Sequence, residues 1–391
     1  MSQQEEFRGF QVRDLMKMHT PFYLYDLRLL EDTLDEISRM TADDLVTVHY
    51  AVKANGNPEI LSVIAKHGLG ADVVSGGEIQ AALKAGFRPE DIAYSGVGKT
   101  DDEIRLGLEY GIGCFNVESV PELEVIDQIA GEMGRTARVA IRVNPDIDAH
   151  THKYITTGTA DNKFGIGIES LDEVIDIALN GLKHIKLLGL HFHIGSQIVQ
   201  MEPYSMLCDT VNGLLDHFEQ RGVSFECVNV GGGLGIDYDN TDEHAIPDFE
   251  QFFGVFKNKL HLRQGQRLHF ELGRSVVGQC GTLIARVLYV KQSRNKRFVI
   301  LDAGMTDLIR PALYGAVHAV RNLTSEECAV ETYDVVGPVC ESSDVFAHDC
   351  RLPVTRRGDI IAICSAGAYG ESMSSGYNMR SPAGCIFNNG R

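Results

Sequence analysis

The sequence predicts an α/β protein made of a (β/α)8 barrel of the TIM type and a second, mostly antiparallel β domain. Between residues 45 and 271, short β-rich runs recur at intervals that suit alternating strands and helices. Eight such runs are what a closed barrel requires, whereas a doubly wound open sheet, the structural alternative, usually has fewer strands. After residue 271 the β-rich segments follow one another without long helical stretches, which is typical of a separate β domain.

The eight predicted barrel strands are short runs rich in β-branched and other apolar side chains. They span residues 45–52, 68–74, 91–95, 112–117, 138–143, 185–193, 225–230 and 267–272. Segments between them, such as 77–86 and 120–134, carry apolar residues at helical spacing and are predicted to be covering helices. Glycines mark the expected ends of these helices, at Gly68, Gly86, Gly111 and Gly181.

The β domain is predicted from β-rich segments in the last third of the chain. They span residues 281–292, 297–304, 331–340 and 359–369. The segment FYLYDL (22–27) is also strand-like and precedes the first barrel helix, so we expect it to join this domain. We therefore expect the barrel over residues 28–275 and the β domain over residues 1–27 plus 276–391, at a chain length for which two domains are usual.

The composition excludes several classes of function. The chain has 391 residues, 44% of them hydrophobic, and a formal net charge of −18, so a nucleic-acid surface is not expected. The polar N-terminus and the lack of any apolar run of about 18 residues argue against a membrane span or secretion. Nine scattered cysteines without a CxxC pair indicate reduced thiols and a cytoplasmic protein.

Lys53 follows the first predicted strand, and reactive residues of such barrels lie at the carboxyl ends of the strands. A lysine there is costly unless its amine is neutralised or reacts, and a desolvated lysine with a lowered pKa is the usual former of Schiff bases. The alternative is a lysine whose amine reaches solvent along its apolar stem.

His191 and His193 lie two residues apart on the sixth predicted strand, so we expect them to point to the same side. A metal-binding pair is one interpretation, but no third ligand with suitable spacing is evident. The other is a flat imidazole stacked on a cofactor ring, with Ser196 in the following turn binding an anion.

Two further motifs follow the last two barrel strands. Gly231, Gly232 and Gly233 follow the seventh strand, where backbone N–H groups commonly hold phosphate, although a tight turn also needs glycine. Glu271 ends the eighth strand, where a carboxylate can keep a pyridine nitrogen protonated. Arg274 can neutralise a phosphate or a substrate carboxylate, or simply pair with Glu271. Together these residues indicate a phosphorylated aldehyde cofactor.

Over nearly its whole length the chain resembles the fold-type III pyridoxal-phosphate-dependent decarboxylases, which have an alanine racemase-like fold, and most closely the branch that acts on diaminopimelate. The motifs that carry the resemblance are TPFYLYD (20–26), YAVKAN (50–55), SGGE (75–78), HKYITTG (152–158), KFGI (163–166), HFHIGSQ (191–197), GGGLG (231–235), ELGR (271–274), RPALYGA (310–316), GPVCESSD (337–344), GAYG (367–370) and YNMR (377–380).

The resemblance implies a cofactor, pyridoxal 5'-phosphate, and a role for each matching residue. Lys53 holds the cofactor as a Schiff base, His193 stacks on the pyridine face, and Glu271 faces the ring nitrogen. The other implied cofactor-binding residues, most of them around the phosphate, are Ser196, Gly231, Gly232, Gly233, Gly273, Arg274 and Tyr369.

The resemblance also implies a reaction, the decarboxylation of meso-2,6-diaminopimelate to L-lysine and CO2, which is the last step of lysine biosynthesis. The active site is shared across a homodimer, and Cys340 donates a proton to the carbanion that CO2 leaves behind. The implied substrate-binding residues are Arg274, Arg310, Tyr314 and Tyr369, with Glu341 meeting the distal ammonium.

Other readings of the sequence stay open. Decarboxylation of carboxynorspermidine, ornithine or arginine keeps the fold and the cofactor, but Arg310 and Tyr314 argue against the last two substrates. An amino-acid racemase needs a different acid–base pair on the two faces of the cofactor. A non-catalytic homologue that binds the cofactor commonly lacks residues such as Cys340, Arg310 or Glu341, which are all present.

Overall fold

The computed structural model describes residues 6–42, 45–147 and 162–388, so the motif HKYITTG (152–158) lies outside the described residues. The chain divides into two compact units. We call residues 34–235 with 248–273 the barrel unit, and residues 1–33, 236–247 and 274–391 the β unit. The segment Ile236–Pro247 thus packs with the β unit although barrel segments precede and follow it in the sequence.

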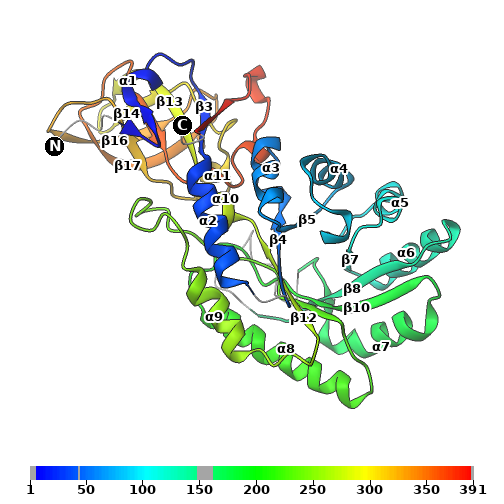
Figure 1. Ribbon diagram of the computed structural model, residues 1–391. Coiled ribbons are helices and arrows are strands. Elements are labelled where there is room, and N and C mark those ends of the chain that lie inside the picture. Colours follow the sequence, from blue (N-terminus) through cyan, green and yellow to red (C-terminus); the bar gives the residue numbers. More distant parts are fainter. Residues whose placement is uncertain (1–5, 43–44, 148–161, 389–391) are drawn as a thin grey trace. The chain divides into compact units, whose positions relative to one another are not determined.

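The barrel unit is a closed ring of parallel strands (Figure 1). Its strands are β4 (Val46–Ala51), β5 (Gly70–Val73), β6 (Ile92–Tyr94), β7 (Cys114–Val117), β8 (Ala137–Asn144), β10 (Ile185–His191), β11 (Cys227–Asn229) and β12 (Arg267–Leu272), with the short β9 (Ile166–Gly167) beside β8. Each predicted barrel strand is present. Because β12 pairs with β4 and β10 pairs with β8, the sheet closes, and the prediction of a barrel rather than an open sheet is confirmed.

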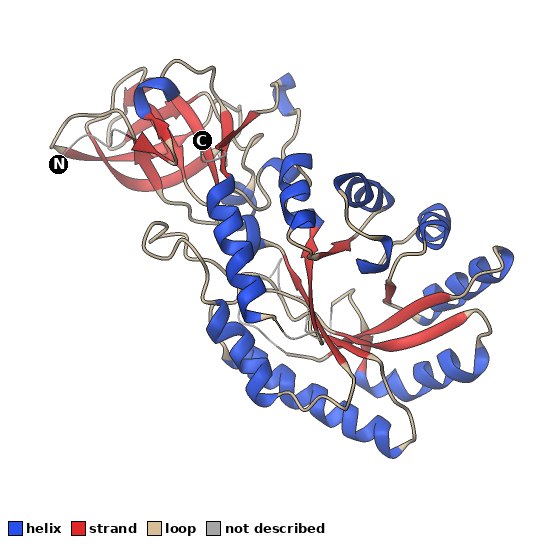
Figure 2. Ribbon diagram, in the orientation of Figure 1, coloured by secondary structure: helices blue, strands red, loops and turns tan. Residues whose placement is uncertain are grey.

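Helices lie outside this ring (Figure 2). They are α2 (Leu27–Met40), α3 (Pro58–Lys66), α4 (Gly76–Ala85), α5 (Asp101–Tyr110), α6 (Val120–Glu132), α7 (Leu171–Asp176), α8 (Glu202–Gln220) and α9 (Phe249–Lys259), with short 3-10 turns at Val52–Ala54, Pro89–Asp91 and Ile168–Ser170. Gly86 and Gly111 adopt left-handed conformations that end α4 and α5, as predicted, and Gly181 ends the π-helical turn Ile177–Gly181 that extends α7.

Local signals explain where the helices begin. Ser75, Thr100 and Ser119 each accept a hydrogen bond from a backbone N–H of the first turn that follows them, and Thr100 forms a full capping box with Glu103. These caps stop the chain from continuing as strand and set the direction of each helix away from the barrel mouth. The residues that follow the strands therefore remain at the carboxyl end of the ring, where they meet.

The β unit holds a mostly antiparallel sheet and short helices. Its strands are β1 (Glu6–Phe7), β2 (Phe10–Gln11), β3 (Phe22–Asp26), β13 (Gly281–Gln292), β14 (Arg297–Leu301), β15 (Val320–Asn322), β16 (Val330–Val336), β17 (Val345–Pro353), β18 (Ile360–Ile363) and β19 (Gly384–Asn388). Its helices are α1 (Val12–Leu15), α10 (Arg274–Val277) and α11 (Arg310–Tyr314), with 3-10 turns at Glu371–Met373 and Tyr377–Met379. The strand β3 pairs antiparallel with β13, which confirms that the early segment FYLYDL joins this sheet.

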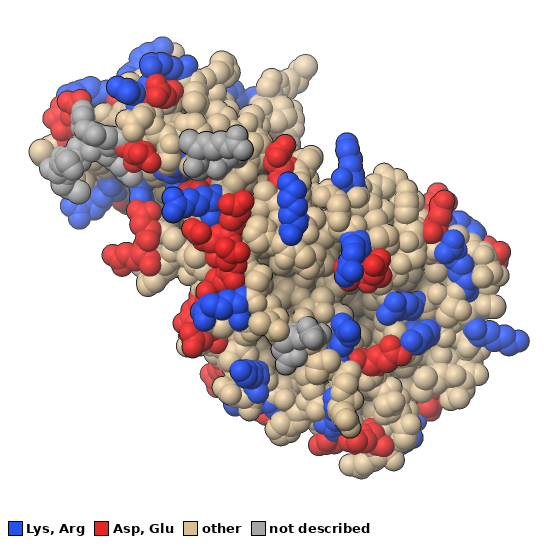
Figure 3. Space-filling model, in the orientation of Figure 1, with Lys and Arg blue, Asp and Glu red and all other residues tan. Residues whose placement is uncertain are grey.

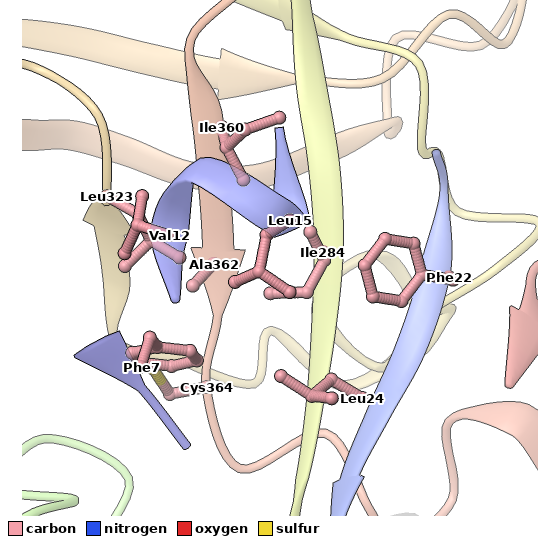
Figure 4. Packing of buried hydrophobic residues seen from close by; sticks show 10 residues of the cluster. All are labelled: Phe7, Val12, Leu15, Phe22, Leu24, Ile284, Leu323, Ile360, Ala362 and Cys364. Carbon is pink, nitrogen blue, oxygen red and sulfur yellow. The ribbon is translucent and has the colours of Figure 1, made fainter. Parts of the chain in front are cut away.

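The N-terminal segment is fixed to the β unit by burial of apolar side chains (Figure 4). The cluster consists of Phe7, Val12, Leu15, Phe22, Leu24, Ile284, Leu323, Ile360, Ala362 and Cys364. Each large apolar side chain buried here contributes about 1.5 to 3 kcal/mol. The β unit therefore combines an N-terminal and a C-terminal segment of the chain, and the barrel segments lie between them in the sequence.

Acidic and basic side chains are interspersed on the face of the molecule drawn in Figure 3, rather than forming one continuous basic surface there. Among the described residues, no helix combines the length and the apolar character needed to cross a membrane.

Candidate active site

Lys53 lies in the 3-10 turn directly after β4, at the carboxyl end of the barrel. Its Nζ is 3.3 Å from Oδ2 of Asp72, which lies in the neighbouring strand β5 and is fully buried. The Lys53 side chain keeps 39% of its surface exposed. A buried carboxylate thus holds the amine, which stays accessible to a ligand. This arrangement does not match the alternative of a lysine whose amine simply extends into solvent.

A chain of hydrogen bonds links Asp72 to Glu271 through the barrel interior. Ser95 Oγ donates to Asp72 Oδ1 at 2.7 Å. The side-chain amide of Asn116 donates both to Ser95 Oγ at 2.9 Å and to Glu271 Oε1 at 3.1 Å. All four side chains are buried, so the two carboxylates are connected in a medium of low polarity.

Glu271 receives three hydrogen bonds from strands of the barrel. Besides Asn116, Asn229 Nδ2 donates to Oε1 at 2.7 Å and His191 Nε2 donates to Oε2 at 3.0 Å. Burial by itself raises the pKa of Glu271, but the charge and hydrogen bond of His191 and the charge of Lys53 outweigh burial and hold it well below the ordinary value. Glu271 is therefore an anion.

Asp72 has the opposite tendency. Burial, and then the charge of Glu271, raise the pKa of Asp72 above its ordinary value, while Lys53 and Ser95 lower it in part. Two linked carboxylates whose environments separate their pKa values can take different roles. Here Glu271 is suited to be a permanent anion, and Asp72 is the carboxylate that more readily holds a proton beside Lys53.

His193 has a different partner from His191. The Gly232 N–H donates to His193 Nδ1 at 3.3 Å. Burial, followed by the positive charges of Arg142 and Lys53, lowers the pKa of His193 well below its ordinary value, so the ring is neutral. No group of three metal-ligating side chains occurs among the described residues, so the metal-pair interpretation gains no support there.

The glycine turn after β11 depends on the absence of side chains. A Cβ on Gly232 would lie 1.8 Å from the backbone O of Glu271, and Gly233 has a φ of +100°. The N–H groups of Gly231 and Gly232 are used by Asn229 and His193, but no acceptor for the Gly233 N–H occurs in the described part of the chain. A bridge between Ile198 and Leu234 holds the turn beside the loop that carries Ser196. These features fit a site for a phosphate group.

Several buried polar side chains of the site were not predicted from the sequence: Asp72, Ser95, Asn116, Asn229 and Arg142. A signal for them exists, because each is a polar residue in or directly after a mostly apolar strand, where burial requires a partner. Arg142, for example, forms a buried ion pair with Glu118 at 2.6 Å, and the ring of Phe164 packs on its guanidinium group. What the sequence does not show is which partner each one meets.

The β unit brings together two predicted arginines. Arg274 Nη1 donates to the hydroxyl of Tyr238 at 2.7 Å, and its guanidinium lies over the ring of Tyr369 at 4.9 Å. The guanidinium of Arg310 lies over the ring of Tyr238 at 4.8 Å. Both arginines are buried, and no carboxylate of the described residues lies within ion-pair distance of Arg310. Two buried cations among aromatic rings suit an incoming carboxylate.

Tyr314 and Tyr369, the other predicted ligands of the β unit, lie on short structured segments. Tyr314 is the last residue of α11, which begins with Arg310. Tyr369 has a left-handed φ of +56°, a conformation that is uncommon for a tyrosine. Burial, and then the nearby charge of Arg274, lower the pKa of Arg310, while Tyr238 partly offsets this.

Cys340 and Glu341 are exposed on a loop that is tightly held at its base. Asp344, which is buried, accepts hydrogen bonds from the N–H groups of Val339 at 2.7 Å and Met305 at 2.6 Å. The motif YNMR supports the tip of the loop, because its tyrosine hydroxyl donates to Glu341 Oε1 at 2.7 Å and its asparagine accepts from the Cys340 N–H at 3.3 Å. The loop therefore displays both side chains at the surface of this chain in a defined orientation.

The barrel, with a lysine after its first strand and a buried anion at the end of its last, defines a pyridoxal-phosphate-dependent decarboxylase of fold type III. A family model described as "Pyridoxal-dependent decarboxylase, pyridoxal binding domain" matches residues 30–278. The chain is 58% identical over 372 residues to the diaminopimelate decarboxylase of Bacteroides thetaiotaomicron, covering 95% of this chain and 96% of the relative. The chain belongs to the diaminopimelate decarboxylase family.

Other relatives and solved structures agree. The diaminopimelate decarboxylase of Pseudomonas aeruginosa is 43% identical over 364 residues, covering 93% of this chain and 86% of the relative. A crystal structure of the Helicobacter pylori diaminopimelate decarboxylase complexed with L-lysine matches with a TM-score of 0.91 and 42% identity, covering 97% of this chain and 95% of that chain. The lysine/ornithine decarboxylase of Vibrio vulnificus, complexed with putrescine, has a TM-score of 0.83 at 22% identity, over 97% of both chains, which shows a shared fold alone.

Proposed function

We propose that this protein decarboxylates meso-2,6-diaminopimelate to L-lysine and CO2 with pyridoxal 5'-phosphate as cofactor. The observation that carries the substrate is the buried Arg310, which has no carboxylate partner among the described residues of its own chain. A second carboxylate at the far end of the substrate distinguishes diaminopimelate from ornithine and arginine, whose far ends are cationic. A buried, unneutralised guanidinium favours the carboxylate and opposes the cation.

Pyridoxal phosphate, when bound, supplies an electron sink for the electron pair that remains on the α-carbon when CO2 leaves. Lys53 Nζ is the amine that holds the cofactor, and Asp72 at 3.3 Å orients that amine and can exchange a proton with it. Glu271 keeps the pyridine nitrogen protonated, because Asn116, Asn229 and His191 together hold it as an anion.

When the cofactor is bound, the neutral ring of His193 would stack on the pyridine ring, and the turn Gly231–Gly233 with Gly273, Ser196 and Arg274 would hold the phosphate. A neutral imidazole is the appropriate stacking partner, since a protonated imidazole would be repelled by the positive charge of the protonated pyridine ring. The lowered pKa of His193 supports this role.

Cys340 Sγ delivers the proton to the α-carbon, and Glu341 meets the distal ammonium. Both residues are exposed on a loop whose backbone is fixed by Asp344, which is the arrangement that a residue needs if it acts in a neighbouring subunit. We therefore also propose a homodimer with shared active sites. Arg274, Arg310, Tyr314 and Tyr369 bind the substrate, with the arginines on its distal carboxylate.

We also propose that the barrel domain (28–275) and the β domain (1–27 plus 276–391) are the functional domains: the first carries Lys53 and Glu271, and the second carries Cys340 and Arg310. Residues 236–247 and 274–275 pack with the β unit. A cytoplasmic location is proposed on the nine cysteines, all of which are free thiols.

The proposal is tested by CO2 release from the purified protein with added pyridoxal phosphate, comparing meso-diaminopimelate, ornithine, arginine and L-lysine. We expect release from diaminopimelate alone, with L-lysine accumulating in equal amount. Lys53→Ala should abolish both the release and the absorbance of the covalently held cofactor. Release from ornithine or arginine at a comparable rate would overturn the assignment of Arg310, and release by the Lys53 variant would overturn the role of the lysine.

A further inference from the structure

His318, buried in the β unit, makes two hydrogen bonds that together define its protonation. The Nε2 atom is 2.7 Å from Arg310 Nη1, and the Nδ1 atom is 2.9 Å from the backbone O of Cys364. A guanidinium group can only donate, so Nε2 accepts; a carbonyl can only accept, so Nδ1 carries the proton. The imidazole is therefore neutral. Burial, and then the charge of Arg310, lower the pKa of His318 to about 3, in agreement with the geometry.

A neutral acceptor has a specific consequence for Arg310. It orients the guanidinium group without neutralising it, whereas an aspartate or glutamate at this place would form an ion pair and weaken attraction for any other anion. Arg310 is only 4% exposed, and its Nε has no hydrogen-bond partner among the described residues. The guanidinium group of Arg310 is thus oriented, and its positive charge remains available to bind an anion.

Tyr238 extends the same arrangement to the second arginine. Its hydroxyl accepts a hydrogen bond from Arg274 Nη1, its ring face lies under the guanidinium of Arg310, and its ring contacts that of His318 edge to face at 5.0 Å. The backbone holds the two aromatic residues together, because the N–H of Ala319, next to His318, donates to the O of Tyr238 at 3.2 Å. One tyrosine thus contacts both guanidinium groups, and one histidine orients that of Arg310.

We propose that His318 and Tyr238 are positioning residues: they orient Arg274 and Arg310 so that both guanidinium groups bind the distal carboxylate of the substrate. His318 does so as an uncharged hydrogen-bond acceptor, which leaves the charge of Arg310 unneutralised. The inference rests on the proposed function and deepens it, because it names the residues that determine specificity for a substrate with a carboxylate at both ends. Both residues act through the arginines and have no role at the reacting atoms.

The test compares three replacements of His318 in the holoenzyme. His318→Gln places an uncharged amide oxygen near the position of Nε2, His318→Leu removes the acceptor, and His318→Glu introduces a carboxylate that neutralises Arg310. The probes are L-lysine, which keeps the distal carboxylate, and cadaverine, which lacks it; their dissociation constants are measured by the change in cofactor absorbance. We expect the leucine and glutamate variants to bind L-lysine about tenfold or more weakly, with the glutamine variant near wild type and cadaverine unaffected in all three.

A second pair of variants distinguishes the loss of one specific contact from a general loss of folding stability. Tyr238→Phe removes only the hydroxyl that Arg274 uses. Its matched control is Tyr333→Phe, since the Tyr333 hydroxyl in β16 is equally engaged, with Glu331 and the Thr355 N–H. We expect Tyr238→Phe to raise the KM for diaminopimelate several-fold with kcat nearly unchanged, and Tyr333→Phe to leave KM unchanged.

The possible outcomes separate the two proposals. If the wild-type protein bound cadaverine as well as L-lysine, the distal carboxylate site itself would be wrong, and with it the proposed substrate. If the wild-type protein discriminated between them, His318→Leu discriminated equally well and Tyr238→Phe left KM unchanged, the positioning roles would be refuted while the proposed function stood. A loss of L-lysine binding in His318→Gln as large as in His318→Leu would also refute the role of an uncharged acceptor.

Discussion

Replacing Glu271 with glutamine should remove the charge that keeps the cofactor's ring nitrogen protonated, while preserving the shape of the side chain. The carboxylate accepts hydrogen bonds from Asn229 at 2.7 Å, from His191 at 3.0 Å and from Asn116 at 3.1 Å. In the variant, the amide oxygen can keep both asparagine donors if the amide nitrogen turns to His191. In that case His191 Nε2 accepts instead of donating, and the ring proton lies on Nδ1, which has no partner among the described residues. The fold should therefore survive the change.

The magnitude follows from these three bonds. Hydrogen bonds to a charged acceptor contribute about 1.5 to 3 kcal/mol, against about 0.5 to 1.5 kcal/mol for neutral pairs. The three donors thus stabilise the ionised Glu271 by about 3 to 4.5 kcal/mol more than they would a neutral group, which is enough to offset burial. In its proposed role, Glu271 would supply one charge-assisted bond to the ring nitrogen, worth about 2 to 3 kcal/mol, so kcat should fall about 30- to 150-fold.

The assay combines CO2 release with the pH dependence of unfolding in urea. The pKa of Glu271 is lower in the folded chain than its unfolded value of about 4.3, so its contribution to stability is full above that pH and is lost as the pH falls. The stability advantage of the wild type over E271Q should therefore shrink between about pH 5 and pH 3.

Glu122→Gln is the matched control in the same barrel. Glu122 is ion-paired with Lys99 at 2.6 Å, but burial chiefly raises its pKa, so the sign reverses. The wild-type advantage over E122Q should grow as the pH falls through the same range, with kcat unchanged. Retention of kcat in E271Q within about threefold of wild type, with unchanged cofactor affinity, would refute the role of Glu271 as an essential anion.

Three further changes test other parts of the site. Gly232→Ala places a Cβ 1.8 Å from the backbone O of Glu271, so we expect the unfolding free energy to fall by more than about 3 kcal/mol and cofactor binding to weaken. Gly254→Ala, on the open face of α9, is the control and should leave the unfolding free energy unchanged or raise it. Urea titration measures both changes. Cys340→Ser should lower kcat about 100-fold or more with little change in KM, since a serine hydroxyl is a far weaker acid than a thiol. Cys328→Ser, at another exposed thiol, should leave kcat unchanged. Equal rates for the wild type and both variants would exclude Cys340 as the proton donor. Asp344→Ala leaves one buried and one partly buried backbone N–H group without an acceptor and should cost about 2 to 5 kcal/mol. The loop should loosen, so the rate at which iodoacetamide alkylates Cys340 should change; an unchanged rate would show that Asp344 does not fix the loop.

The barrel could be predicted because its signals are local. The run predicted as a strand at 45–52 forms β4 at Val46–Ala51, and Lys53 follows directly in a 3-10 turn. Alternation of strands and helices with capped helix starts and glycine ends depends only on neighbours within one turn or one strand. Since parallel strands all present their carboxyl ends to one mouth of the barrel, the approximate place of Lys53 and Glu271 follows from their positions after strands one and eight.

The environment of those residues could not be predicted in the same way. Asn116 and Asn229 appear in the sequence as single polar residues in apolar runs, which indicates that each needs a partner but not that both donate to Glu271 Oε1. That convergence requires closure of the sheet, because Asn116 on β7 and Glu271 on β12 are 155 residues apart in the chain. The separation of the pKa values of Asp72 and Glu271 follows from the same closure and from burial.

By itself, then, the sequence determined the eight-stranded barrel, the following β sheet and the residue types that a phosphorylated aldehyde cofactor needs at the strand ends, because periodicity and motif order are properties of the chain. Only the tertiary structure decided which side chains set the orientation and the charge of those residues. Tyr238 and His318 lie in segments with no distinguishing local pattern, and their role exists because Tyr238 packs between Arg274 and Arg310 while His318 accepts from one of them. A hydrogen bond of about 3 Å is set by the folded backbone at both of its ends, and sequence separation carries no information about that distance.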